Sequence, residues 1–213
     1  MSDDIKLTLK EKFDITVEAG LQLIPWIGGS LATAYFGTKN EKRLKRIESF
    51  YEEFSRQIQE KNVKFNSIDA HDEDALIAII ERLNEKIEEE TLEEKRDYFK
   101  KFLTNTLVEP TNKNNFDERR FFLDTLGNMT MLEIELITFL STIDNDFILV
   151  GSINKPGIDQ SIFVGTVGRL KNYGFVDAVT QGITVGGNVN NALNEGIRLN
   201  NFGRRFFQFC ISG

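Results

Sequence analysis

The chain has 213 residues, enough to bury a hydrophobic core in one large domain or two small ones. Its composition, 40% hydrophobic and 28% charged, is that of a soluble globular protein. The formal net charge of −7 argues against general affinity for nucleic acids, because phosphate binding depends on Lys and Arg. The one cysteine, Cys210, excludes an intramolecular disulfide framework and fits a reducing compartment. The acidic start Met-Ser-Asp-Asp does not read as a signal peptide, so we expect a cytoplasmic protein.

Near the N-terminus, residues 3–18 alternate in part like a strand but favour a helix, and residues 19–37 contain no charged side chain. The uncharged segment is long enough to cross a membrane, but Pro25 and four glycines interrupt it. Two interpretations stay open: a broken helical hairpin packed in the core, or a segment that contacts or conditionally enters a membrane. In the second case the candidate membrane or partner contacts are Leu23, Ile24, Trp26, Ile27 and Tyr35.

Apolar residues at steps of three and four predict amphipathic helices over residues 40–60 and 72–90. Thr91 and Glu94 have the spacing of a capping box, which predicts a helix from there to about Val108. The polar stretch that begins at Pro110 breaks the helical pattern and is the predicted boundary between the domains. We therefore expect a helical domain over residues 1–110 and a second domain over residues 111–213.

The second domain begins with a predicted short helix over residues 116–126, ended by Gly127 and Asn128. Thr130 and Glu133 form a second capping-box signature, which predicts a helix through Leu140. Residues 146–158 have the composition of a linker with some extended character.

The last part of the chain combines one more helix with predicted strands. Residues 159–173 indicate a helix that ends at Gly174 in the left-handed conformation. Residues 175–179, 183–185 and 196–199 then have the pattern of hairpin strands. A final helix is expected over residues 201–211, with Phe202, Phe206, Phe207 and Cys210 directed inward.

The order helix, helix, glycine-terminated helix, hairpin and helix is typical of a winged-helix module. The predicted fold class is therefore mainly α: an N-terminal helical bundle followed by a winged-helix-like module with a small β-hairpin. In such a module residues 159–173 would read DNA, but they offer two cations, opposed by Asp159. A structural or protein-contact role is favoured, with DNA binding as the alternative. The candidate polyanion contacts are Lys42, Arg43, Arg46, Arg169 and Lys171.

The sequence contains no recognisable arrangement of catalytic residues. The single histidine, His71, lies at an acidic helix start, where a capping or solvated role is expected, and Cys210 lies on an apolar helix face. No phosphate-binding loop or dinucleotide fingerprint occurs, and the acidic pairs, such as Asp72 with Asp74, fit a solvated helix face. We expect no catalytic residues, no metal, no cofactor and no small-molecule substrate; a hydrolase that uses acidic residues is the remaining enzymatic alternative.

Four segments resemble the abortive-infection alpha family of bacterial proteins. They are Tyr98–Pro110, Arg120–Ile137, Leu170–Val176 and Phe202–Cys210, and the resemblance covers roughly Asp72 to Cys210. The chain departs from the family pattern at Met131, where members often have Pro, and at Asn200 or Asn201, where they have Thr. The family provides no catalytic residues to carry over.

This resemblance implies a role in bacterial defence against phage or in the biology of mobile elements. The prediction is a non-enzymatic defence protein that acts through protein or membrane contacts and binds a protein partner or itself. The alternative is a winged-helix regulator of transcription or another nucleic-acid-binding protein. Localisation is expected to be cytoplasmic, with association to the membrane as the variant that residues 19–37 suggest.

Overall fold

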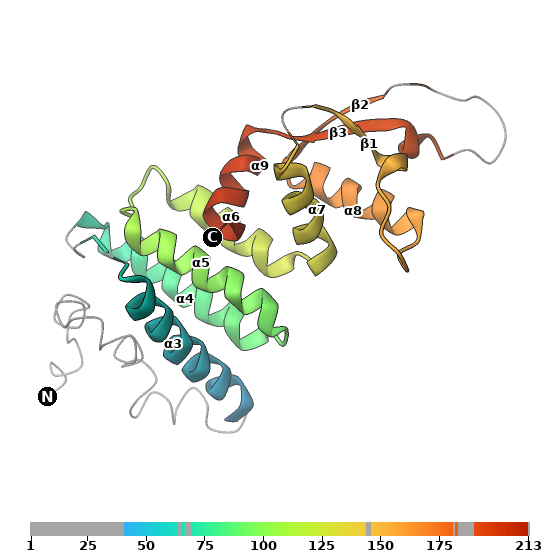
Figure 1. Cartoon of the computed structure of the whole chain (residues 1–213). Helices are drawn as coiled ribbons and strands as arrows, with labels where there is room; N and C mark the ends of the chain where they lie inside the picture. Colours follow the sequence, from blue (N-terminus) through green and yellow to red (C-terminus); the bar gives the residue numbers. More distant parts are fainter. Residues whose placement is uncertain are drawn as a thin grey trace, which may run out of the picture. The chain divides into compact units, whose positions relative to one another are not determined.

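The computed structural model describes residues 41–63, 65–66, 70–143, 146–180, 182 and 190–212. In these ranges the chain is mainly α-helical with one small antiparallel sheet, as predicted (Figure 1). The chain divides into two compact units, Met1–Gly127 and Asn128–Gly213. The helix predicted at 3–18 and the uncharged segment 19–37 lie outside the described residues.

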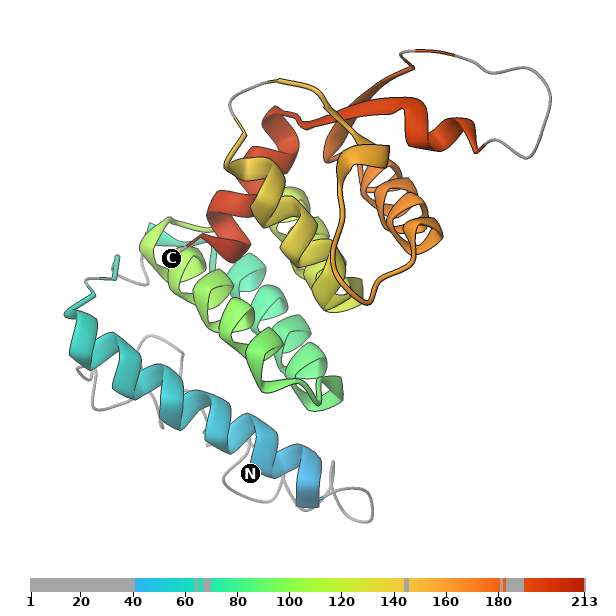
Figure 2. The same cartoon turned by 45° about the vertical axis from the view of Figure 1, so that its right-hand side comes forward.

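The first unit contains α3 (Glu41–Lys61), α4 (Glu73–Glu89), α5 (Glu93–Val108) and α6 (Phe116–Asn128). α3, α4 and α5 lie side by side in two views (Figures 1 and 2). Each helix turns its apolar stripe inward, because burying that face removes hydrocarbon from water. The buried stripe residues are Ile47, Phe50, Phe54, Ile58, Leu76, Ile79, Leu83, Ile87, Phe99, Phe102, Leu103, Leu107, Phe122, Leu123 and Leu126.

Polar contacts join α6 to α4 and α5 within this unit. Arg82 Nε lies 2.7 Å from Asp124 Oδ1, and Lys95 Nζ donates to the carbonyl oxygen of Gly127 at 2.8 Å. The boundary between the two units falls between Gly127 and Asn128, the last two residues of α6, whereas the sequence pattern predicts a boundary after residue 110.

The helix ends agree with the predictions in part. Thr130 Oγ1 accepts the N–H of Glu133 at 3.3 Å while Glu133 Oε2 accepts the N–H of Thr130 at 2.6 Å, so the second capping box is confirmed. The box predicted at Thr91 is wrong: Leu92 is the N-cap of α5, and Glu90 Oε1 accepts its N–H at 2.9 Å. The predicted stop of α6 is also too early, since the helix includes Gly127 and Asn128.

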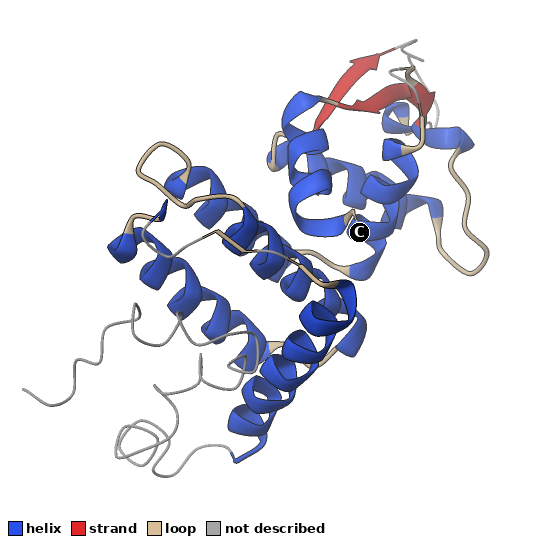
Figure 3. Cartoon of the chain, turned by 60° about the vertical axis from the view of Figure 1, so that its left-hand side comes forward, coloured by secondary structure: helices blue, strands red, loops and turns tan. Residues whose placement is uncertain are grey.

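The second unit combines helices with the sheet (Figure 3). Its elements are α7 (Met131–Ser141), β1 (Ile148–Leu149), η3 (Val150–Ser152), α8 (Gln160–Asn172), β2 (Val176–Thr180), η4 (Asn191–Asn194), β3 (Glu195–Leu199), α9 (Asn201–Phe206) and the π-helical turn η5 (Phe207–Ile211). Gly174 ends α8 with φ of 74°, as predicted. The strand predicted at 183–185 lies outside the described residues.

The sheet has the order β1-β3-β2, and both pairings are antiparallel. Residues 146–158 are therefore more than a linker, because β1 is part of the sheet. Ile197 and Leu199 of β3 are buried, whereas Leu149 of β1 and Val179 of β2 are exposed. Because side chains alternate along a strand, one face of the sheet packs on the core and the other faces solvent.

The end of β3 and the start of α9 pack closely on Phe175, the residue directly before β2. The Phe175 ring stacks on Phe206 with centroids 4.4 Å apart and lies 5.5 Å from Phe202. At Gly203, an added Cβ would clash with the carbonyl oxygen of Phe175 and lie 2.7 Å from Leu199 Cδ1. The glycine therefore lets α9 approach the backbone at Phe175.

We predict that Gly203→Ala destabilises the protein by about 1–3 kcal/mol, the range for overpacking a tight site. Gly165→Ala is the matched control, because nothing lies within 4 Å of a Cβ there and alanine favours helix. Urea unfolding measures both free energies. Equal stability of the two variants would contradict the close packing at Gly203.

Candidate functional site

The two cations predicted to contact polyanions on α8 are both engaged inside the second unit. Arg169 Nη2 donates to the carbonyl oxygen of Asn128 at 2.8 Å and to the Tyr173 hydroxyl at 2.7 Å. Its Nε lies 2.9 Å from Glu133 Oε1. Lys171 Nζ lies 2.8 Å from Glu195 Oε2. These side chains hold α8 to neighbouring elements.

Glu133 is the centre of this arrangement, because its side chain is 1% exposed. Oε2 accepts the backbone N–H of Thr130 at 2.6 Å and the Thr130 hydroxyl at 2.9 Å. Oε1 has no hydrogen bond of good geometry, so the charge of Arg169 is what compensates it. The carboxylate thus joins the start of α7 to α8.

Acidic partners also hold other cations of residues 128–213. Lys155 pairs with Glu135, and Arg198 Nη2 lies 3.0 Å from Asp177 Oδ2. At least four of the six Lys and Arg in this range make such ion pairs: Lys155, Arg169, Lys171 and Arg198. The other exposed positions of α8 are the uncharged residues Ser161, Ile162, Gly165 and Asn172.

The basic cluster of α3 is only partly described. Arg43 is exposed, and the guanidinium of Arg46 donates to the carbonyl oxygen of Glu88. The side chain of Lys42 lies outside what the structure describes, as do the candidate membrane contacts Leu23, Ile24, Trp26, Ile27 and Tyr35. Among the described helices, none combines the length and apolar character that crossing a bilayer needs.

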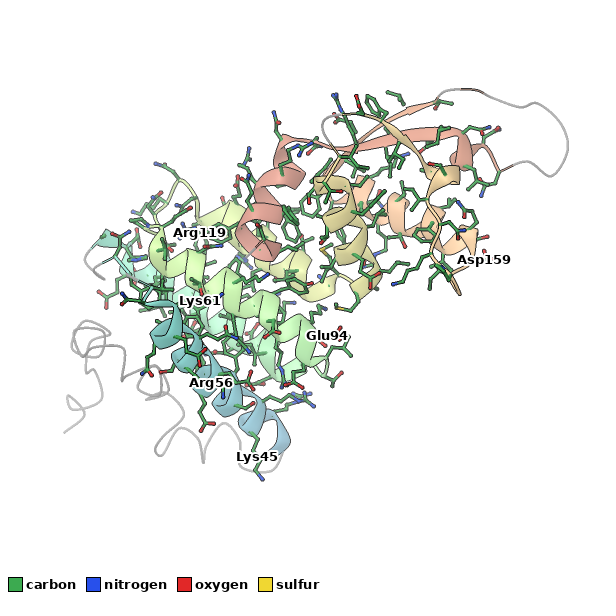
Figure 4. All side chains as sticks on the ribbon, in the orientation of Figure 1. Lys45, Arg56, Lys61, Glu94, Arg119 and Asp159 are labelled. Carbon is green, nitrogen blue, oxygen red and sulfur yellow. The ribbon has the colours of Figure 1, made fainter. Side chains whose placement is uncertain are left out.

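A buried polar cluster, which the sequence pattern did not predict, lies between the end of α5 and the first turn of α6. His71 is 9% exposed, which corrects the expectation of a solvated role, and its Nδ1 accepts the N–H of Thr111 at 3.0 Å. Arg119, labelled in Figure 4, donates to Thr111 Oγ1 at 2.5 Å and to the Glu109 carbonyl at 3.0 Å. The N–H of Asp72 donates to the carbonyl oxygen of Thr111 at 2.7 Å, so the loop before α6 is fixed to the start of α4.

The surroundings of His71 favour its neutral form. Burial lowers the pKa of His71 below its ordinary value of 6.5, the positive charge of Arg119 lowers it further, and a hydrogen bond with the backbone of Leu107 opposes the change. A protonated Nδ1 could no longer accept the N–H of Thr111. The arrangement is therefore suited to holding a loop, not to transferring protons.

The acidic residues considered for catalysis have structural partners. Asp72 caps α4 by accepting the N–H of Ala75 at 3.2 Å, and Glu90 lies 2.9 Å from Lys95. Asp72 is half-buried rather than freely solvated, whereas Asp74 is exposed as predicted, and the Glu90 side chain is 13% exposed. In the described ranges, no group of three His, Cys, Asp or Glu residues is placed to hold a metal ion.

One hollow of about 260 Å³ lies within the first unit, between α4 and α6. Arg82, one of its lining residues, already contacts Asp124 and Glu85. Cys210 is fully buried, as predicted, and burial raises the pKa of its thiol. Neither the hollow nor the thiol offers a nucleophile next to a base. The residues that line the hollow are Ala78, Ile79, Glu81, Arg82, Glu85, Phe116 and Arg120.

A sequence signal for the buried charges did exist. Arg119 precedes Phe122, Leu123 and Leu126 by three, four and seven residues, so it occupies a position of the apolar stripe. Lys95 stands in the same relation to Phe99 and Phe102. A charge at such a position implies a buried partner, although it does not tell which one.

Comparisons with protein families, with curated proteins and with solved structures found no match for this chain.

We predict that the free energy of unfolding decreases as the pH falls below about 6.5, the pKa of an unperturbed histidine. The pKa of His71 is lower in the folded state, so the unfolded chain binds the proton first and the decrease levels off below the folded-state pKa. His71→Asn keeps a hydrogen-bond acceptor and removes the titration. Urea unfolding between about pH 7.5 and pH 5 measures the slope, which histidine titration dominates in this window. An equal slope in the variant would contradict the proposed cause.

Proposed function

We propose that the protein is a non-enzymatic bacterial phage-defence protein of the abortive-infection type that acts by binding another protein. The resemblance of its four segments supports the biological role. One structural observation carries the mode of action: the second unit pairs its cations internally and leaves α8 with a neutral exposed face. A surface of this kind suits a protein partner better than a polyanion.

Exposed apolar side chains of the second unit support protein contact. Ile162 on α8 is 50% exposed, and Phe139 on α7 is 42% exposed. Ile162 lies in the first turn of α8, where its N–H donates to the carbonyl oxygen of Asp159 at 3.0 Å, so the helix fixes its backbone position. A fixed, exposed isoleucine is a suitable anchor for a partner. Membrane contact through residues 19–37 is the second route by which the protein would act.

The winged-helix-like assignment of the second unit belongs to this proposal. The order β1-β3-β2, with α7 before β1 and α8 before β2, supports the assignment. The short η3 and the loop after it occupy the place between β1 and α8 where a further helix is usual in such modules. The arrangement is equally suited to contacts with DNA and with protein.

The direct test is phage challenge of bacteria that carry the gene. We expect infected cultures with the gene to limit phage production, and Ile162→Glu to abolish protection by placing a charge on the α8 face. Leu92→Glu is the matched control, because Leu92 is 51% exposed on the first unit. Circular dichroism and thermal unfolding establish that both variants are folded. Full protection by a folded Ile162→Glu variant would exclude α8 as the contact surface, and absence of protection by the wild-type gene would exclude the defence role.

The alternative function is a winged-helix regulator that binds nucleic acid, which the strand order favours. Under our proposal the full chain gives no salt-sensitive shift of duplex DNA at about 50 mM salt, because the cations of α8 are neutralised by Glu133 and Glu195. Fluorescence anisotropy with a long labelled duplex measures this. Binding that weakens steeply between about 50 and 200 mM salt, and weakens further in Lys171→Ala, would establish the alternative instead.

A further inference from the structure

The outer edge of β2 offers backbone groups for pairing. Among the described residues, β3 is the only strand that pairs with β2, and it covers one edge. Ala178 and Thr180 are exposed, and Val179 is 40% exposed. An uncovered strand edge recognises another extended strand through main-chain hydrogen bonds.

The register of β2 and β3 tells which residues point their backbone groups outward. The N–H of Asn200 donates to the carbonyl oxygen of Phe175 at 3.0 Å, and Val176 stands opposite Leu199. Antiparallel pairs alternate between hydrogen-bonded and non-hydrogen-bonded positions. The backbone N–H and C=O groups of Asp177 and Val179 are therefore those that hydrogen-bond to β3. The N–H and C=O groups directed to the outer edge are consequently those of Val176, Ala178 and Thr180.

The outer edge has few of the features that prevent pairing. Strand edges in monomeric proteins are usually blocked by charged side chains, proline or bulges. β2 contains one charged residue, Asp177, and Arg198 on β3 neutralises it at 3.0 Å. Leu149 and Val179 both stand opposite Gly196 in the register, so they form an apolar row on the same sheet face.

We propose that β2 pairs antiparallel with β2 of a second copy of the chain, with the twofold axis at Ala178. The outward residues are placed symmetrically about Ala178, so Val176 stands opposite Thr180 of the second copy and Ala178 opposite itself. Every outward N–H and C=O then meets its complement. Asp177 stands opposite Val179 of the second copy, which avoids a like-charge contact. The edge is thus complementary to itself, as an isologous interface requires.

This pairing concerns assembly and does not rest on the proposed defence function. The strand is short, so the pairing buries little area and belongs to the weak, transient class, for which we expect dissociation constants on the order of micromolar or higher. The sheet becomes continuous across the two copies, and the rows of Leu149 and Val179 of both copies lie on one face.

A charge-swap experiment tests the axis. In the proposed pair the two residues at position 178 lie about 5 Å apart. Ala178→Lys and Ala178→Glu should therefore each be monomeric, because like charges oppose each other, and an equimolar mixture should recover the dimer. Analytical ultracentrifugation over about 5–500 µM covers the expected range of dissociation constants.

The matched control is the pair Leu92→Lys and Leu92→Glu, which changes an exposed apolar residue of the first unit and should leave the dimer intact. Circular dichroism establishes that all four variants are folded. A wild-type protein that stays monomeric over this range overturns the proposal. It is overturned as well if the variants at position 178 dimerise singly, or if mixing them fails to recover the dimer.

Discussion

The buried carboxylate of Glu133 is the constraint on which much of the second unit depends. A carboxylate removed from water needs compensation, since an unpaired buried charge costs several kcal/mol. Thr130 supplies a backbone N–H and a hydroxyl, and Arg169 supplies the opposite charge. The same guanidinium binds Asn128 and Tyr173, so one side chain connects the start of α7 with the end of α8. Arg169, on the helix that would read DNA in a winged-helix module, thus uses its guanidinium for contacts that stabilise the fold.

In the first unit, several buried charged side chains likewise have compensating partners. Lys100 is buried, and its Nζ lies 2.5 Å from Glu53 Oε2 and 2.9 Å from Asp97 Oδ1. The guanidinium of Arg119 donates to the Thr111 hydroxyl and to a backbone carbonyl oxygen. Burial is the larger cause of the lowered pKa of His71, and the positive charge of Arg119 is the second. These charges select one arrangement of α3, α5, α6 and the loop before α6, because each loses its partner in any other. Apolar stripes alone would permit more than one packing.

Local signals predicted the helices well, and long-range partners account for what they missed. The capping box at Thr130, the glycine stop at Gly174 and the apolar stripes depend on residues within one or two turns, so the sequence contains the necessary information. The box at Thr91 failed because Glu90, one residue earlier, binds the N–H of Leu92 instead.

The candidate site was less predictable than the fold. Arg169 and Lys171 were found as cations, but their neutralisation by Glu133 and Glu195 needs contacts across more than twenty residues. The burial of His71 depends on Thr111 in the same way. The membership of β1 in the sheet follows from its pairing with β3, and two residues are too few to give a periodic signal.

What remains for recognition in the second unit is mostly uncharged: the apolar residues of α8 and α7, and the backbone edge of β2. Ion pairs among solvent-exposed groups weaken in salt, whereas apolar burial and main-chain hydrogen bonds change little. Arg169, Lys171 and Arg198 already have acidic partners, so under our proposal binding by this unit releases few counterions. Contacts made by this unit should therefore be set by shape and strand register, which favours a protein partner, including a second copy of the chain, over a polyanion.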